Sequence, residues 1–158
     1  MQTTLCYIER GDETLMLYRN KKKDDPNGGK WIAVGGKFEF GESPEECMLR
    51  EVREETGFRL SEWSYRGLVT FLSGDWCEYM HLFTGQAPEG DIIDCDEGTL
   101  RWMRNDEIDA LPAWEGDRIF LRLLREGRAF FSLKLVYEPE GETLKCAVLD
   151  GEELPLAR

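Results

Sequence analysis

The chain has 158 residues, the size of one ordinary domain. Its composition, with 41% hydrophobic and 33% charged residues, is typical of a folded globular protein. No apolar run approaches the length of a membrane span, so no membrane partner is expected. The 20 Lys and Arg against 32 Asp and Glu give a net charge of −12, and such a surface repels polymeric nucleic acid. A small phosphorylated substrate is not excluded, because bound divalent cations can reverse the local sign.

The cysteines indicate a reducing environment. Five cysteines lie far apart and form no CxxC pair, which disfavours a disulfide framework and a zinc site. Most of them stand among apolar residues, so we expect small buried side chains rather than catalytic thiols. No basic stretch followed by an apolar one opens the chain, so no signal peptide is expected and a cytoplasmic protein is predicted. The protein is expected to be a monomer or a homodimer.

The first part of the chain predicts short strands and one loop. Strands are predicted at Thr3–Glu9, Leu15–Arg19 and Trp31–Val34. The polar segment Asn20–Lys30 is typical of a loop, and the Gly35-Gly36 pair is expected to end the third strand.

The next segment carries clear helix signals. Ser43 is a good N-cap, Pro44 suits the first helical position, and Glu46 completes a capping box with Ser43. Gly57 is typical of the C-terminal end. These signals predict a helix over Pro44–Thr56.

The second half predicts mostly strands. They are expected at Leu60–Leu72, Trp76–Thr84, Leu100–Met103, Phe130–Tyr137 and Leu144–Leu149. Apolar positions at helical spacing predict a helix over Asp117–Arg125, with a helical turn at Asn105–Ala110 and an acidic loop at Gln86–Gly98. Mixed strands with two inserted helices indicate an α+β fold rather than regular βαβ alternation.

Glu51, Glu54 and Glu55 stand at i, i+3 and i+4 of the first helix, so they share one face. Like charges at this spacing destabilise a helix by roughly 0.2–0.5 kcal/mol per pair. A hard divalent cation such as Mg²⁺ would compensate, because it prefers carboxylates together with substrate phosphates. The alternative is a charged, solvated helix with no ligand.

The residues around these glutamates also leave two interpretations open. Arg50 would form an exposed salt bridge of little weight, or it would orient a catalytic carboxylate. Glu42 would join the metal ligands or brace the arginine. Gly35 and Gly36 allow the backbone to approach closely, so that a main-chain carbonyl could serve as a ligand.

The segment from Gly36 to Phe58, GKFEFGESPEECMLREVREETGF, resembles the Nudix box, G-x5-E-x7-R-E-U-x-E-E-x-G-U, in which U is a bulky apolar residue. The fixed positions are Gly36, Glu42, Arg50, Glu51, Glu54, Glu55 and Gly57, with Val52 and Phe58 at the apolar positions. With each residue type used at roughly 5–7%, seven such matches by chance have a probability on the order of one in a billion per start position.

The resemblance implies one Nudix hydrolase domain over residues 1–158, with an α/β/α sandwich around a mixed sheet. It implies that Glu51, Glu54 and Glu55 bind Mg²⁺ or Mn²⁺ and that Arg50 orients Glu51. It also implies hydrolysis of a nucleoside diphosphate linked to another group, by in-line attack of a metal-activated water at phosphorus.

The flanking segments are similar to the MutT-type branch, whose members convert oxidised purine triphosphates such as 8-oxo-dGTP to the monophosphate and pyrophosphate. The similar segments are KWIAVGGK, which includes Trp31, and LPAWEGD before the last helix. The resemblance implies that Trp114 stacks on the base and that Asp117 bonds the purine edge. The alternatives are a packing role for Trp114 and an N-cap role for Asp117.

Further contacts are expected from scattered charged residues. By resemblance, Glu97 completes the metal ligands, with Asp94 and Asp96 as rivals and a solvated acidic loop as the alternative. Lys37 and Arg19 would contact phosphates or simply lie at the surface.

Two departures from the branch leave the substrate open. Ile32 stands where some members carry a base-reading asparagine, and Gly116 stands where some carry a second acidic residue. A site with fewer paired donors and acceptors discriminates less between bases. The alternatives are a Nudix hydrolase acting on ADP-ribose, a dinucleotide or an RNA 5′ end, and a binding module that has lost catalysis.

Overall fold

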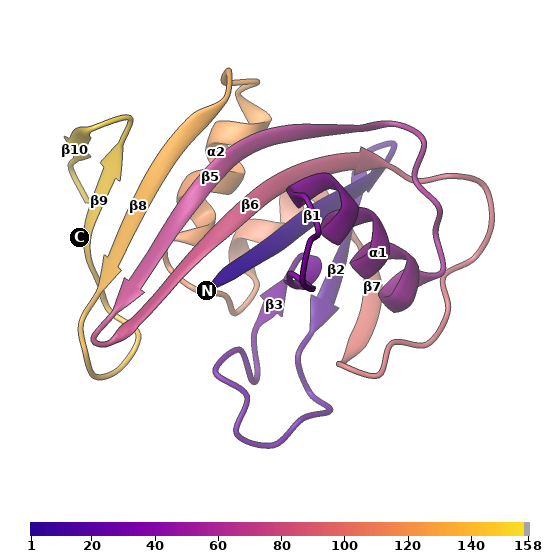
Figure 1. Ribbon diagram of the computed structural model, residues 1–158, viewed down its shortest axis with the longest axis horizontal. Helices are drawn as coiled ribbons and strands as arrows, with labels where there is room; N and C mark the ends of the chain where they lie inside the picture. The colour runs from indigo at the N-terminus through magenta and orange to yellow at the C-terminus, as the bar shows by residue number, and fades with distance from the viewer. Residues whose placement is uncertain (157–158) are drawn as a thin grey trace.

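The computed structural model describes residues 1–156 and shows a mixed β-sheet flanked by helices (Figure 1). The strands are β1 Gln2–Arg10, β2 Glu13–Tyr18, β3 Trp31–Ile32, β4 Val34–Lys37, β5 Trp63–Ser73, β6 Trp76–Gln86, β7 Thr99–Arg104, β8 Phe131–Tyr137, β9 Leu144–Leu149 and β10 Glu152–Leu154. The helices are α1 Pro44–Thr56, a 3-10 helix at Asn105–Ala110, and α2 Asp117–Arg125. The fold is therefore α+β, as predicted.

The strand order is β10-β9-β8-β5-β6-β1-β2-β3, while β4 pairs with β1 and β7 pairs with β2. β1 runs parallel to β6 and β5 runs parallel to β8, whereas the other pairs are antiparallel. The antiparallel pairing of β5 with β6 confirms the predicted hairpin.

Side-chain alternation along β1 separates two cores. Cys6 and Ile8 point to one face and pack with Met48 and Val52 of α1. Tyr7 points to the other face, where it packs with a cluster that includes Phe120 of α2. The two helices therefore cover opposite faces of the sheet, which gives the α/β/α sandwich of the Nudix fold.

The helix α1 begins and ends as its sequence predicts. Ser43 accepts a hydrogen bond from the Glu46 backbone N–H, and the Glu46 side chain accepts one from the Ser43 backbone, which closes the capping box. Gly57 ends the helix in the left-handed conformation, with φ at 81°. These caps fix where each glutamate of the helix lies.

The prediction that Gly35-Gly36 ends a strand is wrong. Both glycines lie inside β4, where they pair with Leu5 and Thr4 of β1. A Cβ on Gly35 would lie 1.8 Å from the Thr4 carbonyl oxygen, so glycine serves close strand approach here rather than a turn.

Other boundaries differ by smaller amounts. The segment predicted as one strand over Trp31–Val34 is divided between β3 and β4, and β5 begins at Trp63 rather than Leu60. The short strand β10 was not predicted. No helix within residues 1–156 has the length and apolar character needed to cross a membrane.

Candidate active site

Glu55 occupies the most enclosed position among the acidic residues of α1. Its Oε2 accepts a hydrogen bond from the Gly35 backbone N–H at 2.9 Å, whereas Oε1 is buried and has no hydrogen-bond partner among residues 1–156. Burial raises the pKa of Glu55 to about 8, and the nearby Glu51 and Glu97 add to the shift. An unpaired buried carboxylate oxygen indicates that this carboxylate is built to meet another polar group.

Glu51 lies one turn before Glu55 and faces the glycines of β4. A Cβ on Gly36 would lie 2.5 Å from the Glu51 carboxyl carbon, so any larger residue there would have to displace this carboxylate from its present position. Burial raises the pKa of Glu51 although Arg50 opposes the shift. The close approach keeps the carboxylate against the floor of a cavity.

Arg50 joins the acidic residues of the segment. Its Nε and Nη2 donate to the two Glu42 oxygens at 2.7 and 2.9 Å, and Nη1 donates to Glu51 at 2.8 Å and Glu54 at 3.1 Å. Its Nη2 also donates to the Lys37 carbonyl at 3.0 Å. With 14% of its side chain exposed, Arg50 is enclosed and is not a surface ion pair. The Arg50 guanidinium holds the pKa of Glu42 below its usual value.

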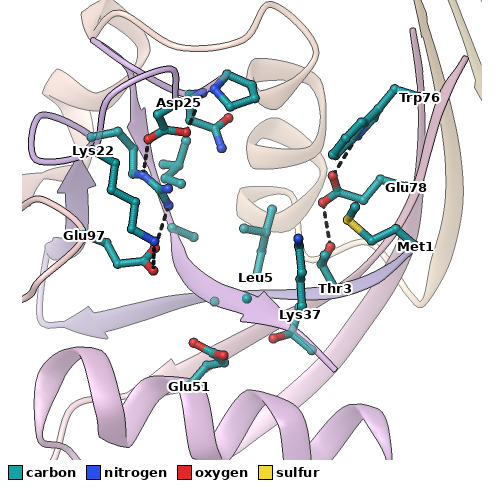
Figure 2. A pocket seen from close by; sticks show the side chains of 18 residues that line it. Met1, Thr3, Leu5, Lys22, Asp25, Lys37, Glu51, Trp76, Glu78 and Glu97 are labelled. Atoms are coloured by element: carbon teal, nitrogen blue, oxygen red, sulfur yellow. Dashed lines mark hydrogen bonds and ion pairs between the residues drawn. The ribbon is translucent and has the colours of Figure 1, made fainter. Parts of the chain in front are cut away.

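A cavity of about 490 Å³ opens above Glu51 (Figure 2). Glu97 and Lys22 lie on one side, Trp76 and Glu78 lie on the other, and Lys37 projects between them. Glu97 forms ion pairs with Arg19 at 3.0 Å and with Lys22 at 2.7 Å. The cavity therefore brings acidic and basic side chains from five separate segments together.

The donor set suits a hard divalent cation, because it consists of carboxylates and includes the unpaired oxygen of Glu55. No three acidic, histidine or cysteine side chains of residues 1–156 already converge closely enough to hold an ion. The ion pairs explain this spacing. Glu51 and Glu54 are turned toward Arg50, and Glu97 is turned toward Arg19 and Lys22. A cation would meet the carboxylate oxygens of Glu51 and Glu54 that Arg50 does not hold, and Glu97 would have to turn away from Arg19 and Lys22.

A second cavity of about 320 Å³ adjoins the first and is mainly apolar. The two share lining residues, including Asn27, Ile32, Trp76 and Glu78. Trp114 lines the second cavity. We call the first the charged cavity and the second the aromatic cavity. Together they form one elongated space with a charged end and an aromatic end. Such a space fits a ligand with a phosphate group and a flat ring system.

Trp114 is fixed on several sides. Its ring meets Phe71 and Tyr137 edge to face, with centroids 5.3 and 5.2 Å away. The Lys30 ammonium lies 4.6 Å from the ring centroid, and the indole N–H donates to Asn27 Oδ1 at 2.8 Å. Trp114 therefore packs against its neighbours and also lines the cavity.

Asp117 is buried at the start of α2 and lines the aromatic cavity. Burial raises its pKa to about 7, although Arg118 and Lys30 oppose the shift. The alternative N-cap role for Asp117 is wrong, because Gly116 is the N-cap and Asp117 is the first helical residue.

Of three further residues predicted to contact the substrate, two line the charged cavity and one does not. Lys37 and Arg19 line the charged cavity, whereas Trp31 lines neither cavity and instead packs against Tyr18 in a tilted arrangement, with ring centroids 4.9 Å apart. The substrate contact predicted for Trp31 therefore stays a prediction without support from the geometry.

Sequence reasoning did not find Asn27, Trp76 and Glu78, which line both cavities. Trp76 donates to Glu78 at 3.1 Å, and Glu78 accepts from Thr3 of β1 at 2.7 Å. An aromatic residue at the tip of a predicted hairpin was the one available signal for Trp76. No local pattern marks Asn27 or Glu78.

Comparisons with known proteins agree with this geometry. Residues 1–124 match the family model of the NUDIX domain. An uncharacterised Nudix hydrolase of Bacillus subtilis, YvcI, is 31% identical over 153 residues, which cover 90% of each chain. The oxidised purine nucleoside triphosphate hydrolase of Danio rerio is 30% identical over 111 residues, covering 69% of this chain and 71% of that protein.

A solved structure extends the agreement to three dimensions. The MutT mutator protein of Bacillus halodurans has a TM-score of 0.83 and 28% identity, covering 96% of this chain and 98% of that one. Members of this family generally act on small nucleotide substrates with the help of divalent cations. The complete box, the fold and these relatives together show that the chain belongs to the Nudix family and is a Nudix hydrolase.

Proposed function

We propose that this enzyme hydrolyses purine nucleoside triphosphates to the monophosphate and pyrophosphate, and that it acts on oxidised purines such as 8-oxo-dGTP. The observation that carries the proposal is that the charged cavity and the aromatic cavity adjoin each other. A triphosphate would lie at the first and its base at the second. The relative from Danio rerio, named for oxidised purine triphosphates, supports this choice of substrate.

The charged end would hold Mg²⁺, with Mn²⁺ as a substitute, through Glu51, Glu54, Glu55, Glu97 and the Gly35 carbonyl. The unpaired Oε1 of Glu55 supports this assignment. When bound, the cation supplies charge neutralisation at phosphate oxygens and lowers the pKa of a water.

The chain's own residues orient these groups. Arg50 holds Glu51 and Glu54 in place and is itself braced by Glu42, so a loss of the guanidinium would release both carboxylates. Lys37 and Arg19 line the same cavity and would neutralise phosphate oxygens of the substrate.

The aromatic end would bind the base. Trp114 is held rigidly by its neighbours, so it presents a stacking surface with little loss of conformational entropy on binding. Asp117 would accept from an N–H on the purine edge, or share its proton with a ring acceptor. Its pKa of about 7 gives it access to both states near neutral pH.

The cysteines support action in a reducing compartment, which we propose is the cytoplasm. All five are free, and Cys6, Cys47 and Cys95 are buried. Burial raises the pKa of the Cys6 and Cys47 thiols, which favours the unreactive protonated form.

A substrate panel with Mg²⁺ tests the function: 8-oxo-dGTP, 2-hydroxy-dATP, the ordinary triphosphates, ADP-ribose, NADH and a diadenosine polyphosphate, with product identification. We expect the highest kcat/KM with an oxidised purine triphosphate and release of pyrophosphate. A preference for ADP-ribose or a dinucleotide would refute the base assignment. A lack of turnover with every compound would indicate a binding module instead.

A further inference from the structure

The loop Asn20–Lys30 forms a wall of the aromatic cavity through Pro26 and Asn27. The loop is held by hydrogen bonds within it and by hydrogen bonds with Arg19, the residue before it. Arg19 donates to Asp25 Oδ2 at 2.7 Å, Asp25 Oδ1 accepts from the Asn27 backbone N–H at 3.0 Å, and Lys30 N–H donates to the Asn27 carbonyl at 3.0 Å. Asn27 is therefore presented by a turn with hydrogen bonds on both sides of it.

The orientation of the Asn27 amide follows from its partner. The indole N–H of Trp114 can only donate, so the atom facing it at 2.8 Å must be the Asn27 carbonyl oxygen. The amide nitrogen then points away from the indole. It makes no side-chain hydrogen bond with any of residues 1–156, which leaves two N–H donors available to a ligand.

The other side chains of this cavity that the structure describes offer no N–H group without an internal partner. The Trp76 indole N–H is bonded to Glu78, and the Trp114 indole N–H is bonded to Asn27. The Ser73 hydroxyl donates to the Glu138 carbonyl at 3.3 Å, and Glu78 carries a carboxylate that accepts when ionised. Asp117 donates only in its protonated form. Of the side-chain N–H groups lining the described cavity, the Asn27 amide is the one without an internal partner.

We propose that Asn27 selects the base: its amide nitrogen donates to a keto oxygen of a guanine-type purine, while its carbonyl oxygen holds Trp114 as the stacking surface. This inference rests on the proposed function and names a residue that determines its specificity. An adenine-type base carries an amino group at the corresponding edge, so two donors would face each other and the Asn27 amide nitrogen would find no acceptor on the base. Ile32 supplies no such donor, so the loop takes over that task.

The test uses binding without catalysis. The protein is titrated with dGMP and with dAMP in metal-free buffer containing EDTA, and the tryptophan indole signals are followed by NMR, with the Trp114 signal assigned from Trp114→Phe. We expect the wild type to bind dGMP about tenfold more tightly than dAMP, the factor that corresponds to about one hydrogen bond.

Two variants separate the two tasks of Asn27. Asn27→Asp keeps an acceptor for the Trp114 indole but removes the donors, so the Trp114 signal should stay in place while the tenfold preference for dGMP is lost. Asn27→Ala removes both, so the Trp114 signal should shift and both nucleotides should bind more weakly. Asn20→Asp is the matched control, because Asn20 is exposed in the same loop and lines neither cavity.

The inference is overturned by a wild type that binds neither nucleotide or binds both equally. It is equally overturned if Asn27→Asp retains the full preference for dGMP. A failure to release pyrophosphate from triphosphates would refute the proposed function alone, because the titration needs neither metal nor bond cleavage.

Discussion

The two ends of the candidate site are built in different ways. Three of the four carboxylates proposed as ligands at the charged end come from one continuous segment, in which α1 and its caps set the positions of Glu51, Glu54 and Glu55, and Glu97 joins them from a loop. The aromatic end combines Asn27 from a loop, Trp76 and Glu78 from β6, and Trp114 before α2. The first arrangement depends on helical periodicity, whereas the second depends on how distant strands pair.

The two ends also differ in how their polar groups are satisfied. Arg50 neutralises the acidic segment through bonds to three glutamates, and this leaves Glu55 Oε1 as the buried unpaired oxygen. At the aromatic end, single hydrogen bonds hold flat side chains in place. We therefore expect substitutions at the charged end to affect turnover and substitutions at the aromatic end to affect substrate affinity.

Glu54→Gln should have the largest effect. The change removes a charge without volume, and we expect kcat to fall by about 100-fold or more because an oxygen ligand of the cation is weakened. The side chain is 53% exposed, so the melting temperature should not change. Steady-state kinetics and thermal denaturation measure both. Glu45→Gln on the same helix is the control, and a near-normal rate in Glu54→Gln would refute the metal assignment.

Arg50→Lys should reduce both activity and stability. An ammonium cannot reproduce the fork of hydrogen bonds to Glu42, Glu51 and Glu54, so we expect kcat/KM to fall by about 10–100-fold. The free energy of unfolding should fall by about 1–3 kcal/mol, measured by urea denaturation. Arg53→Lys is the control, since Arg53 is exposed on the same helix. Equal losses in both variants would mean that Arg50 has no special orienting role.

Asp117→Asn tests the buried carboxyl at the aromatic end. Its pKa of about 7 in the folded protein lies above the ordinary value of 3.8, so between these values the folded state holds a proton that the unfolded state releases. The contribution of Asp117 to stability therefore decreases as the pH rises from about 4 to about 7.

The neutral amide removes this dependence. At pH 8 we expect Asp117→Asn to be more stable than the wild type by about 2–4 kcal/mol, and the difference to shrink toward pH 4. Urea denaturation across this range measures it. Glu55 adds a slope of the same sign to both proteins, so their difference reports on Asp117. A difference that does not vary with pH would contradict the raised pKa.

The sequence predicts the helices and the box better than the strand edges, for physical reasons that particular residues show. Ser43, Glu46 and Gly57 act on their near neighbours, so the bounds of α1 follow from local chemistry. From the sequence alone, Gly35 is typical of a strand end. In the fold it lies inside β4, where a side chain would collide with the Thr4 carbonyl of β1, and the sequence around Gly35 does not record that contact.

The same limit explains the residues that the sequence does not reveal. Glu78 reaches Thr3 only because β6 runs parallel to β1, with Thr3 opposite Met80. Asn27 and Trp114 are 87 residues apart, and their contact requires both the loop and the start of α2 to be in place. No periodicity or motif records such a contact.

Trp114→Ala should have the smallest effect, and it measures the aromatic end alone. Loss of one stacked indole corresponds to roughly 1–3 kcal/mol, so we expect KM for purine triphosphates to rise about tenfold or more while kcat changes little. Trp114→Phe keeps a ring but loses the N–H that donates to Asn27. Its KM should lie between those of the wild type and Trp114→Ala. Trp63→Ala is the control, because Trp63 lines neither the charged nor the aromatic cavity. An unchanged KM in Trp114→Ala would place the base elsewhere, whereas a large fall in kcat would show that the two ends act as one unit.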